Sequence, residues 1–117
     1  MSQNRKRRGY RTQKVVADWL RENGWPHATS TGAGRQGADV ENVPDLAIEV
    51  KARADFAPVA WVKQARASAD GRLPLVVYRA NGQGEKVEDY LAIVRLGDLL
   101  PLLHGSGYGD PDPWKWP

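Results

Sequence analysis

The stretch that decides the fold is GADVENVPDLAIEVKA, residues 37–52. Its second half, DLAIEVKA, has an apolar side chain at every other position, which is the period of a β-strand with a buried face. Ala47, Glu49 and Lys51 fall together on the opposite face. Because Ala47 is small, this face has room for water or ions beside the two charged side chains.

The first half of the same stretch predicts the neighbour of this strand. Residues 38–41 form a short strand, and the Asn-Val-Pro sequence that follows is typical of a tight turn. We therefore expect the two strands to pair as a β-hairpin. That pairing would bring Asp39 beside Glu49 and Lys51.

Apolar runs on either side of the hairpin predict an α/β fold. Residues at helical spacing indicate a leading helix with Trp19 on its buried stripe, and Trp25 and Trp61 are also expected in the core. The predicted order is α-β-β-α-β-β-α, a mixed β-sheet flanked by helices. The elements are a helix at 10–23, the hairpin at 38–52, a helix at 58–70, strands at 73–79 and 89–94, and a helix at 96–103.

The 117 residues suffice for one domain with two extensions. Residues 1–9 are expected to be a flexible basic arm, residues 10–104 the folded domain, and residues 105–117 a tail rich in Pro, Gly and Trp. Trp114 and Trp116 in that tail either cover an apolar patch, pack on a second subunit or remain disordered.

Composition excludes several kinds of site. The chain has no Cys, which excludes disulfides, zinc–thiolate sites and cysteine nucleophiles. His27 and His104 are isolated in sequence and suggest neither a zinc site nor a general base. No apolar run approaches the roughly 20 residues that cross a membrane, and no signal-like stretch follows the basic start. We expect a cytoplasmic protein without membrane contact.

Positive charge is concentrated at the N-terminus. Six of the 17 basic residues precede the first acidic one, Asp18, and the remainder of the chain has 11 basic and 14 acidic residues. A phosphate-rich partner would be attracted to such an end, although a solubilising tail has the same composition. The six residues are Arg5, Lys6, Arg7, Arg8, Arg11 and Lys14.

The two carboxylates of the hairpin suggest metal chemistry. Converging carboxylates repel each other unless a cation or a proton compensates. Magnesium prefers hard oxygen ligands, and it stabilises charge on a phosphoryl group and lowers the pKa of a bound water. Lys51 would then orient the water or stabilise the anionic transition state. The alternative is a solvated strand face, because Glu-x-Lys occurs often by chance.

With Asp39 followed by IEVKA, the chain resembles the PD-(D/E)XK nuclease superfamily, and its layout looks most like the Holliday-junction resolvases of archaea and some phages. The resemblance covers about residues 7–80, including the opening basic-Gly helix, Ser30 in a Gly-containing loop, a helix with Gln64 and the strand PLVVYR. It implies a restriction-endonuclease-like core that uses Mg²⁺, with Mn²⁺ as a substitute. It also implies a homodimer that makes paired nicks in four-way DNA junctions.

The resemblance also implies roles for individual residues. Asp39 and Glu49 correspond to metal ligands, and the backbone carbonyl of Val50 to a further ligand. Lys51 corresponds to the catalytic lysine. Asp45, in a literal Pro-Asp, is an alternative to Asp39, but it would lie on the same strand as Glu49, whereas the first acidic ligand normally comes from the neighbouring strand.

Two further positions correspond to the family pattern less directly. Archaeal members have a glutamate on the first helix, four residues after a glycine, where this chain has Gln13. An amide oxygen can hold a metal-bound water but carries no charge, so a second metal would bind more weakly. Ser30 matches a loop serine that contacts the substrate or supports the active site.

Other side chains are candidates for DNA contact. The loop GAGRQG lacks the Lys-Ser/Thr of a P-loop, so its glycines either let Arg35 and Gln36 adapt to DNA or form only a long approach to the hairpin. Residues after the Glu-x-Lys strand would continue a phosphate track, although each is as compatible with a solvated surface. These candidates are Arg35, Gln36, Arg53, Lys63, Gln64 and Arg66.

Two other functions remain open from the sequence. One is a different DNA nuclease of the same superfamily, restriction-like or directed at single strands. The other is a catalytically inactive DNA-binding module that keeps the acidic cluster.

Overall fold

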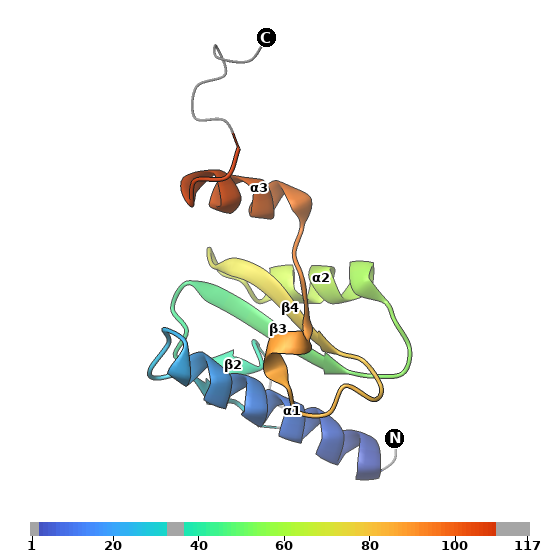
Figure 1. Ribbon diagram of the computed structural model, residues 1–117. Coiled ribbons are helices and arrows are strands. Elements are labelled where there is room, and N and C mark those ends of the chain that lie inside the picture. The colour runs from blue at the N-terminus through green and yellow to red at the C-terminus, as the bar shows by residue number, and fades with distance from the viewer. Residues whose placement is uncertain (1–2, 33–36, 110–117) are drawn as a thin grey trace, which may run out of the picture.

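A mixed three-stranded sheet forms the centre of the computed structural model, which describes residues 3–32 and 37–109 (Figure 1). β3 (Leu46–Ala52) runs parallel to β4 (Leu73–Arg79), and β5 (Leu91–Ile93) runs antiparallel to β4. Parallel neighbours need a crossover connection, and α2 (Pro58–Ala67) supplies it.

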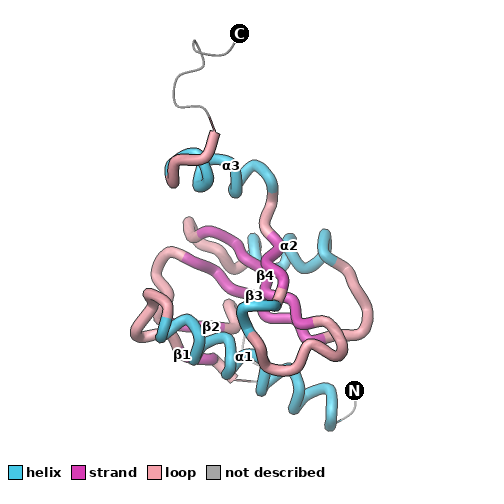
Figure 2. The backbone as a smooth tube through the Cα atoms, in the orientation of Figure 1, coloured by secondary structure: helices cyan, strands magenta, loops and turns pink. Residues whose placement is uncertain are grey.

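The remaining elements surround this sheet. α1 (Gln3–Glu22) lies along one face of the molecule, as Figure 2 shows. A separate two-stranded antiparallel sheet joins β1 (Thr29–Ser30) to β2 (Val40–Glu41). A 3-10 turn, η1 (Val87–Asp89), precedes β5, and α3 (Leu96–Gly105) follows it. The prediction of an α/β fold with a mixed sheet and flanking helices is confirmed at this level.

Two apolar layers hold α1 and α2 on opposite faces of the sheet. On one face, Val16 and Leu20 of α1 pack in a cluster with Ile48 and Val50 of β3. On the other face, a second cluster joins α2 to β4 and contains Trp61, Ala65, Val76 and Tyr78. The alternation predicted for residues 45–52 is therefore correct, and it sends Glu49 and Lys51 toward the α2 side.

The predicted β-hairpin is wrong as a strand pairing. The ladder partner of β2 is β1, and β3 pairs with β4 instead. The chain turns away at Asn42, whose φ is +62°. An alternating pattern shows which side chains share a face, but it does not show which strand lies alongside. Consecutive residues 47–50 of β3 are all buried, which is typical of a strand covered on both faces.

The leading helix is longer than predicted. It begins at Gln3 and not near Tyr10, so most of the segment predicted as a flexible arm is helical. Lys and Arg are good helix formers, and the only residue between Gln3 and Tyr10 with a strong cost in a helix is Gly9. Periodicity of apolar residues does not reveal this part of the helix, because the sequence of residues 3–9, QNRKRRG, contains no large apolar residue.

The tryptophans differ in their burial. Trp61 is buried, and Trp25 is half-buried against the first core cluster, as predicted. Trp19 is 37% exposed, so its prediction as a core residue is wrong. It lies at the edge of the α1 stripe, where Val16 and Leu20 reach the sheet and Trp19 does not. Trp114 and Trp116 lie outside the described residues.

α3 stands apart from the sheet in Figure 1. No residue of this helix is buried, and Leu96, Leu100 and Leu102 are exposed. It ends two residues beyond the predicted boundary, at Gly105. Within residues 3–32 and 37–109, no helix has the length and apolar character needed to cross a membrane.

Candidate active site

Asp39 is fixed to the edge of β3 by two hydrogen bonds. Its backbone N–H donates to the carbonyl oxygen of Ile48 at 2.8 Å, and its Oδ2 accepts from the backbone N–H of Val50 at 2.7 Å. Both β3 groups point away from β4, since backbone groups of alternate residues leave a strand on the same edge. The carboxyl group of Asp39 is thereby held beside the middle of β3, although the two segments do not form a hairpin ladder.

Glu49 lies between these two β3 residues and is 2% exposed. Its register partner on β4 is Val76, which is fully buried, so the carboxyl group sits against apolar surroundings. The carboxyl groups of Glu49 and Asp39 lie close enough for each to shift the pKa of the other. The structure thus brings together the two acidic residues that the sequence predicts to converge.

Burial and mutual repulsion determine the charge of this acid pair. Burial raises the pKa of Asp39, and the hydrogen bond from Val50 N–H opposes that rise. Burial, followed by the negative charge of Asp39, raises the pKa of Glu49 from its ordinary 4.5 to about 7. Lys51 counteracts both shifts only in part. Without a cation, the pair therefore retains a proton up to near-neutral pH.

Lys51 is positioned by α2. Its Nζ donates to Oε1 of Gln64 at 2.8 Å and lies 4.0 Å from Oε2 of Glu49, the outer limit of an ion pair. Its side chain is 14% exposed, so the ammonium group faces a partly open site. Gln64, predicted as a DNA contact, is exposed, and its amide oxygen accepts the hydrogen bond that orients the lysine. The only sequence signal for this role is its position three residues after buried Trp61, on the sheet-facing side of the helix.

The oxygen atoms at this edge of β3 suit a hard divalent cation. Asp39 and Glu49 provide carboxylates, and the carbonyl of Val50 leaves the strand on the same edge as the N–H that binds Asp39. The described residues contain no cluster of three or more His, Cys, Asp or Glu side chains, so a cation would keep several of its waters. Magnesium commonly binds in this way.

The side-chain oxygen of Gln13 lacks a hydrogen-bond partner among the described residues. Gln13 lies on α1 between buried Thr12 and Val16, and α1 packs on β3. Its Oε1 is buried, and no group in the described part of the chain donates a hydrogen bond to it. A buried acceptor without a partner is costly, and a bound water would satisfy it. The predicted role of Gln13 in holding a metal-bound water stays a prediction.

Ser30 is not in the predicted loop. It lies on β1 opposite Val40, and no contact among the described residues joins its side chain to the acid pair. Its neighbour Thr31 supports the site instead. The backbone N–H of Thr31 donates to the carbonyl oxygen of Asp39 at 3.0 Å, and its Oγ1 is 3.3 Å from the same oxygen. Only the three-dimensional pairing of β1 with β2 reveals this role.

Asp45, the alternative first ligand, has a different partner. Its Oδ1 accepts a hydrogen bond from the indole Nε1 of Trp25 at 3.0 Å, and the residue is exposed. Within the described segments no contact joins it to Glu49. The geometry therefore favours Asp39 over Asp45 as the acidic residue of the site.

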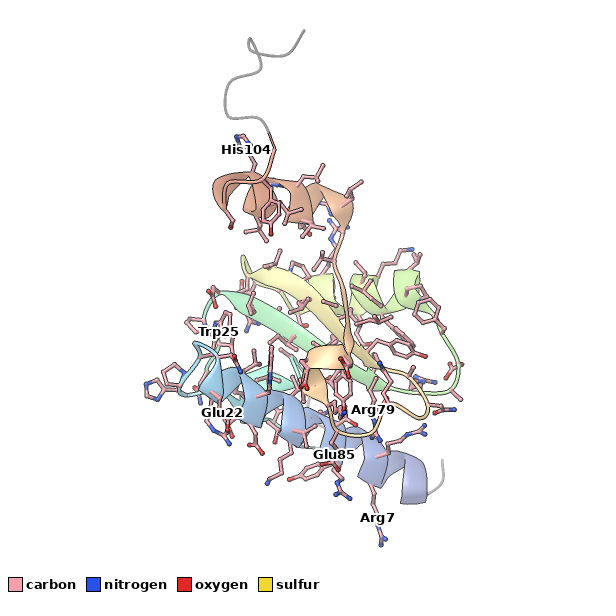
Figure 3. The ribbon with its side chains drawn as sticks, viewed as in Figure 1. Arg7, Glu22, Trp25, Arg79, Glu85 and His104 are labelled. Atoms are coloured by element: carbon pink, nitrogen blue, oxygen red, sulfur yellow. The ribbon has the colours of Figure 1, made fainter. Side chains whose placement is uncertain are left out.

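The basic residues of α1 have varied surroundings. Arg8 is tied to the body of the protein, because its Nε donates to the carbonyl oxygen of Ala52 at 3.1 Å. Arg11 forms an ion pair with Glu85, and Lys14 lies 4.0 Å from Asp18. Figure 3 shows Arg7 pointing away from the body and Glu85 facing α1. The side chains of Arg5 and Lys6 lie outside the described part.

The remaining DNA-contact candidates are scattered. Arg53 pairs with Asp55 at 3.0 Å just after β3. Lys63 and Arg66 are exposed on α2, where they border an apolar groove. His27 and His104 are also exposed, and neither contributes to the acid pair. Arg35 and Gln36 lie outside the residues that the structure describes.

Comparison with known proteins gives no match to a family model, a curated protein or a solved structure. A function therefore has to be argued from the acid pair, the lysine beside it and the charge around them.

The raised pKa of Glu49 predicts how stability depends on pH. Between pH 4.5 and about 7 the folded protein keeps a proton that the unfolded chain has lost, so the free energy of unfolding falls as pH rises. The shift corresponds to roughly 3 kcal/mol, lost fully above about pH 7. Thermal unfolding in EDTA at pH 5 and pH 8 measures it, and Glu49→Gln should remove most of the difference.

Glu88→Gln, which changes an exposed carboxylate of η1, is the matched control and should retain the wild-type pH dependence. If Glu49→Gln and wild type lose the same stability between pH 5 and pH 8, the buried carboxyl group of Glu49 does not carry the shared proton.

Proposed function

We propose that this chain is a divalent-metal-dependent DNA endonuclease of the PD-(D/E)XK type, with a restriction-endonuclease-like core. The observation that carries the proposal is the meeting of the Asp39 and Glu49 carboxyl groups at the edge of β3, with Lys51 held beside them by Gln64. The order of α1, β3, α2 and β4, with helices on both faces of the sheet, is compatible with such a core.

Each residue has a distinct task in phosphodiester hydrolysis. A bound Mg²⁺ would stabilise negative charge on the phosphoryl oxygens and lower the pKa of a water. Asp39, Glu49 and the Val50 carbonyl would hold this ion. The Lys51 ammonium, oriented by Gln64, donates a hydrogen bond toward the attacking water or the phosphoryl oxygen. The water oxygen bonds to phosphorus, one bridging P–O bond breaks, and the departing oxygen takes a proton.

A four-way junction is the substrate that we favour. α1 contains a run of basic residues. One of them, Arg8, donates a hydrogen bond to the carbonyl oxygen of Ala52 at the end of β3, the strand that contains Glu49. Phosphate neutralisation by such residues supplies sequence-independent affinity. Another nuclease of this superfamily, or an inactive DNA-binding module, would share these features, because substrate choice depends on loops and subunit geometry.

A cleavage assay separates these possibilities. With Mg²⁺, the protein should nick a synthetic four-way junction and cut a linear duplex of equal length far more slowly. Lys51→Ala should abolish cutting while sparing junction binding, since its ammonium acts on the reacting groups. Lys86→Ala, at an exposed lysine before η1, should cut like wild type.

Equal cutting of junction and duplex would point to another DNA nuclease. Binding without cutting under Mg²⁺ or Mn²⁺ would contradict the enzymatic proposal. Full turnover by Lys51→Ala would remove that residue from the mechanism.

The active form that we propose is a homodimer formed through α3. A junction with two equivalent strands to be cut suits an enzyme with two symmetric sites. α3 presents Leu96, Leu100 and Leu102 to solvent, and Tyr108 follows them. Its acidic residue Asp98 is paired with Arg95, so little charge opposes the approach of a second copy. Exposed apolar surface of this kind commonly marks an interaction site.

Light scattering should give twice the mass of one chain for the wild-type protein. Leu100→Glu should give a monomer that makes single nicks and no paired ones, because a charge would be buried in the contact. Val59→Glu, at a 69% exposed position on α2, is the control and should remain dimeric. A monomeric wild type, or a dimeric Leu100→Glu, would contradict this interface.

A further inference from the structure

A small basic pocket lies next to the acid pair formed by Asp39 and Glu49. It has a volume of about 190 Å³ and lies between the first turns of α1 and the carboxyl end of β3. We propose that this pocket binds a backbone phosphate of the DNA strand, next to the phosphate that is cut. The proposal rests on the proposed nuclease function and assigns it a second phosphate site. The lining residues are Arg8, Gly9, Val50, Lys51, Ala52, Arg53, Ala54 and Asp55.

The pocket is continuous with the candidate active site. Val50 and Lys51 line it, while the N–H of Val50 binds Asp39 and the Nζ of Lys51 approaches Glu49. A DNA strand whose reacting phosphate lies at the acid pair would therefore pass the pocket with a neighbouring phosphate. The last residues of β3 run from the acid pair to the pocket, so they set the direction in which the DNA strand would lie.

Arg8 is fixed in the wall of this pocket. Its Nε donates to the carbonyl oxygen of Ala52 at 3.1 Å, and its Nη1 donates to Oδ1 of Asn81 at 3.0 Å. These contacts hold the guanidinium group in place and use two of its five N–H donors. No group of the described residues accepts from the other three, so they are available to phosphate oxygens. A preorganised guanidinium group is well suited to phosphate.

Gly9 has no structural reason to be glycine. It lies inside α1, where glycine is a poorer helix former than alanine, and its φ is not positive. A Cβ atom built at this position meets no heavy atom of the described residues within 4 Å. The absence of a side chain on the pocket wall instead lets a ligand approach the helix backbone closely.

The size and charge of the pocket favour a phosphate over a base. Three cationic side chains and one carboxylate, that of Asp55, line it, and Arg53 forms an ion pair with this carboxylate. The remaining positive charge attracts an anion. Among the described residues that line the pocket none is aromatic, so none offers a stacking surface to a base, and the pocket volume is below the roughly 300 Å³ at which small-molecule sites begin.

Gly9→Ala separates a ligand-binding role from a structural one. Alanine should raise the thermal unfolding temperature of the protein, because it stabilises the helix. It should also weaken junction binding at least about tenfold, measured by fluorescence anisotropy in EDTA, because the methyl group enters the phosphate site. Gly105→Ala is the matched control, since this residue of α3 also has open space around it and should leave binding unchanged.

Arg8→Gln provides the second measurement. The slope of log affinity against log salt should become shallower by about one, as expected for one lost phosphate contact. Wild-type affinity for Gly9→Ala together with an unchanged slope for Arg8→Gln would overturn the pocket proposal. If these variants also cut junctions with wild-type KM, the nuclease proposal would survive without the pocket. Impaired binding by both variants in a protein that cuts no DNA would support the pocket and refute the nuclease.

Discussion

The hydrogen bonds between Asp39 and the edge of β3 are the constraint on which the proposed site depends. They hold the segment before β2 against the sheet, and they place one carboxyl group directly beside the buried Glu49. Two carboxyl groups in a poorly solvated place cannot both be charged without compensation. The negative charge of the Asp39 and Glu49 pair therefore has to be compensated. A proton compensates it at low pH, and a cation would do so at neutral pH.

The surrounding structure limits how this demand can be met. Val76 and the α2 cluster exclude water from one side of Glu49, and the lysine that approaches it is held at 4.0 Å by its bond to Gln64. A close ion pair would have neutralised Glu49 and left a merely structural salt bridge. At this spacing the ammonium only partly compensates Glu49, and it keeps N–H donors beyond the one bonded to Gln64 that would reach a phosphoryl oxygen or its attacking water in the proposed reaction.

Local pattern predicted part of this arrangement from the sequence. The two-residue period of β3 placed Glu49 and Lys51 on one face, and the apolar run at residues 73–79 gave β4 with its observed boundaries. The hairpin was wrong because periodicity says nothing about which strand lies alongside. Asp39 nevertheless reaches Glu49, through a single backbone bond and its own carboxylate in place of a ladder.

Contacts between distant elements were beyond such reasoning. The bond from Lys51 to Gln64 spans 13 residues, and the link from Arg8 to Ala52 spans 44. Neither residue type is unusual at its position, so only the packing of α1 and α2 on the sheet gives them a partner. The exposure of Trp19 and the detachment of α3 have the same origin, since burial depends on what other elements cover.

Calorimetric titration with Mg²⁺ at pH 7, in two buffers that differ in heat of protonation, tests the acid pair as a cation site most directly. Binding should release up to about one proton per cation, because the ion replaces the proton that Asp39 and Glu49 share. Asp39→Asn should bind far more weakly and release less. Wild-type protein that binds no Mg²⁺, or an Asp39→Asn variant that binds it equally well, would contradict the assignment.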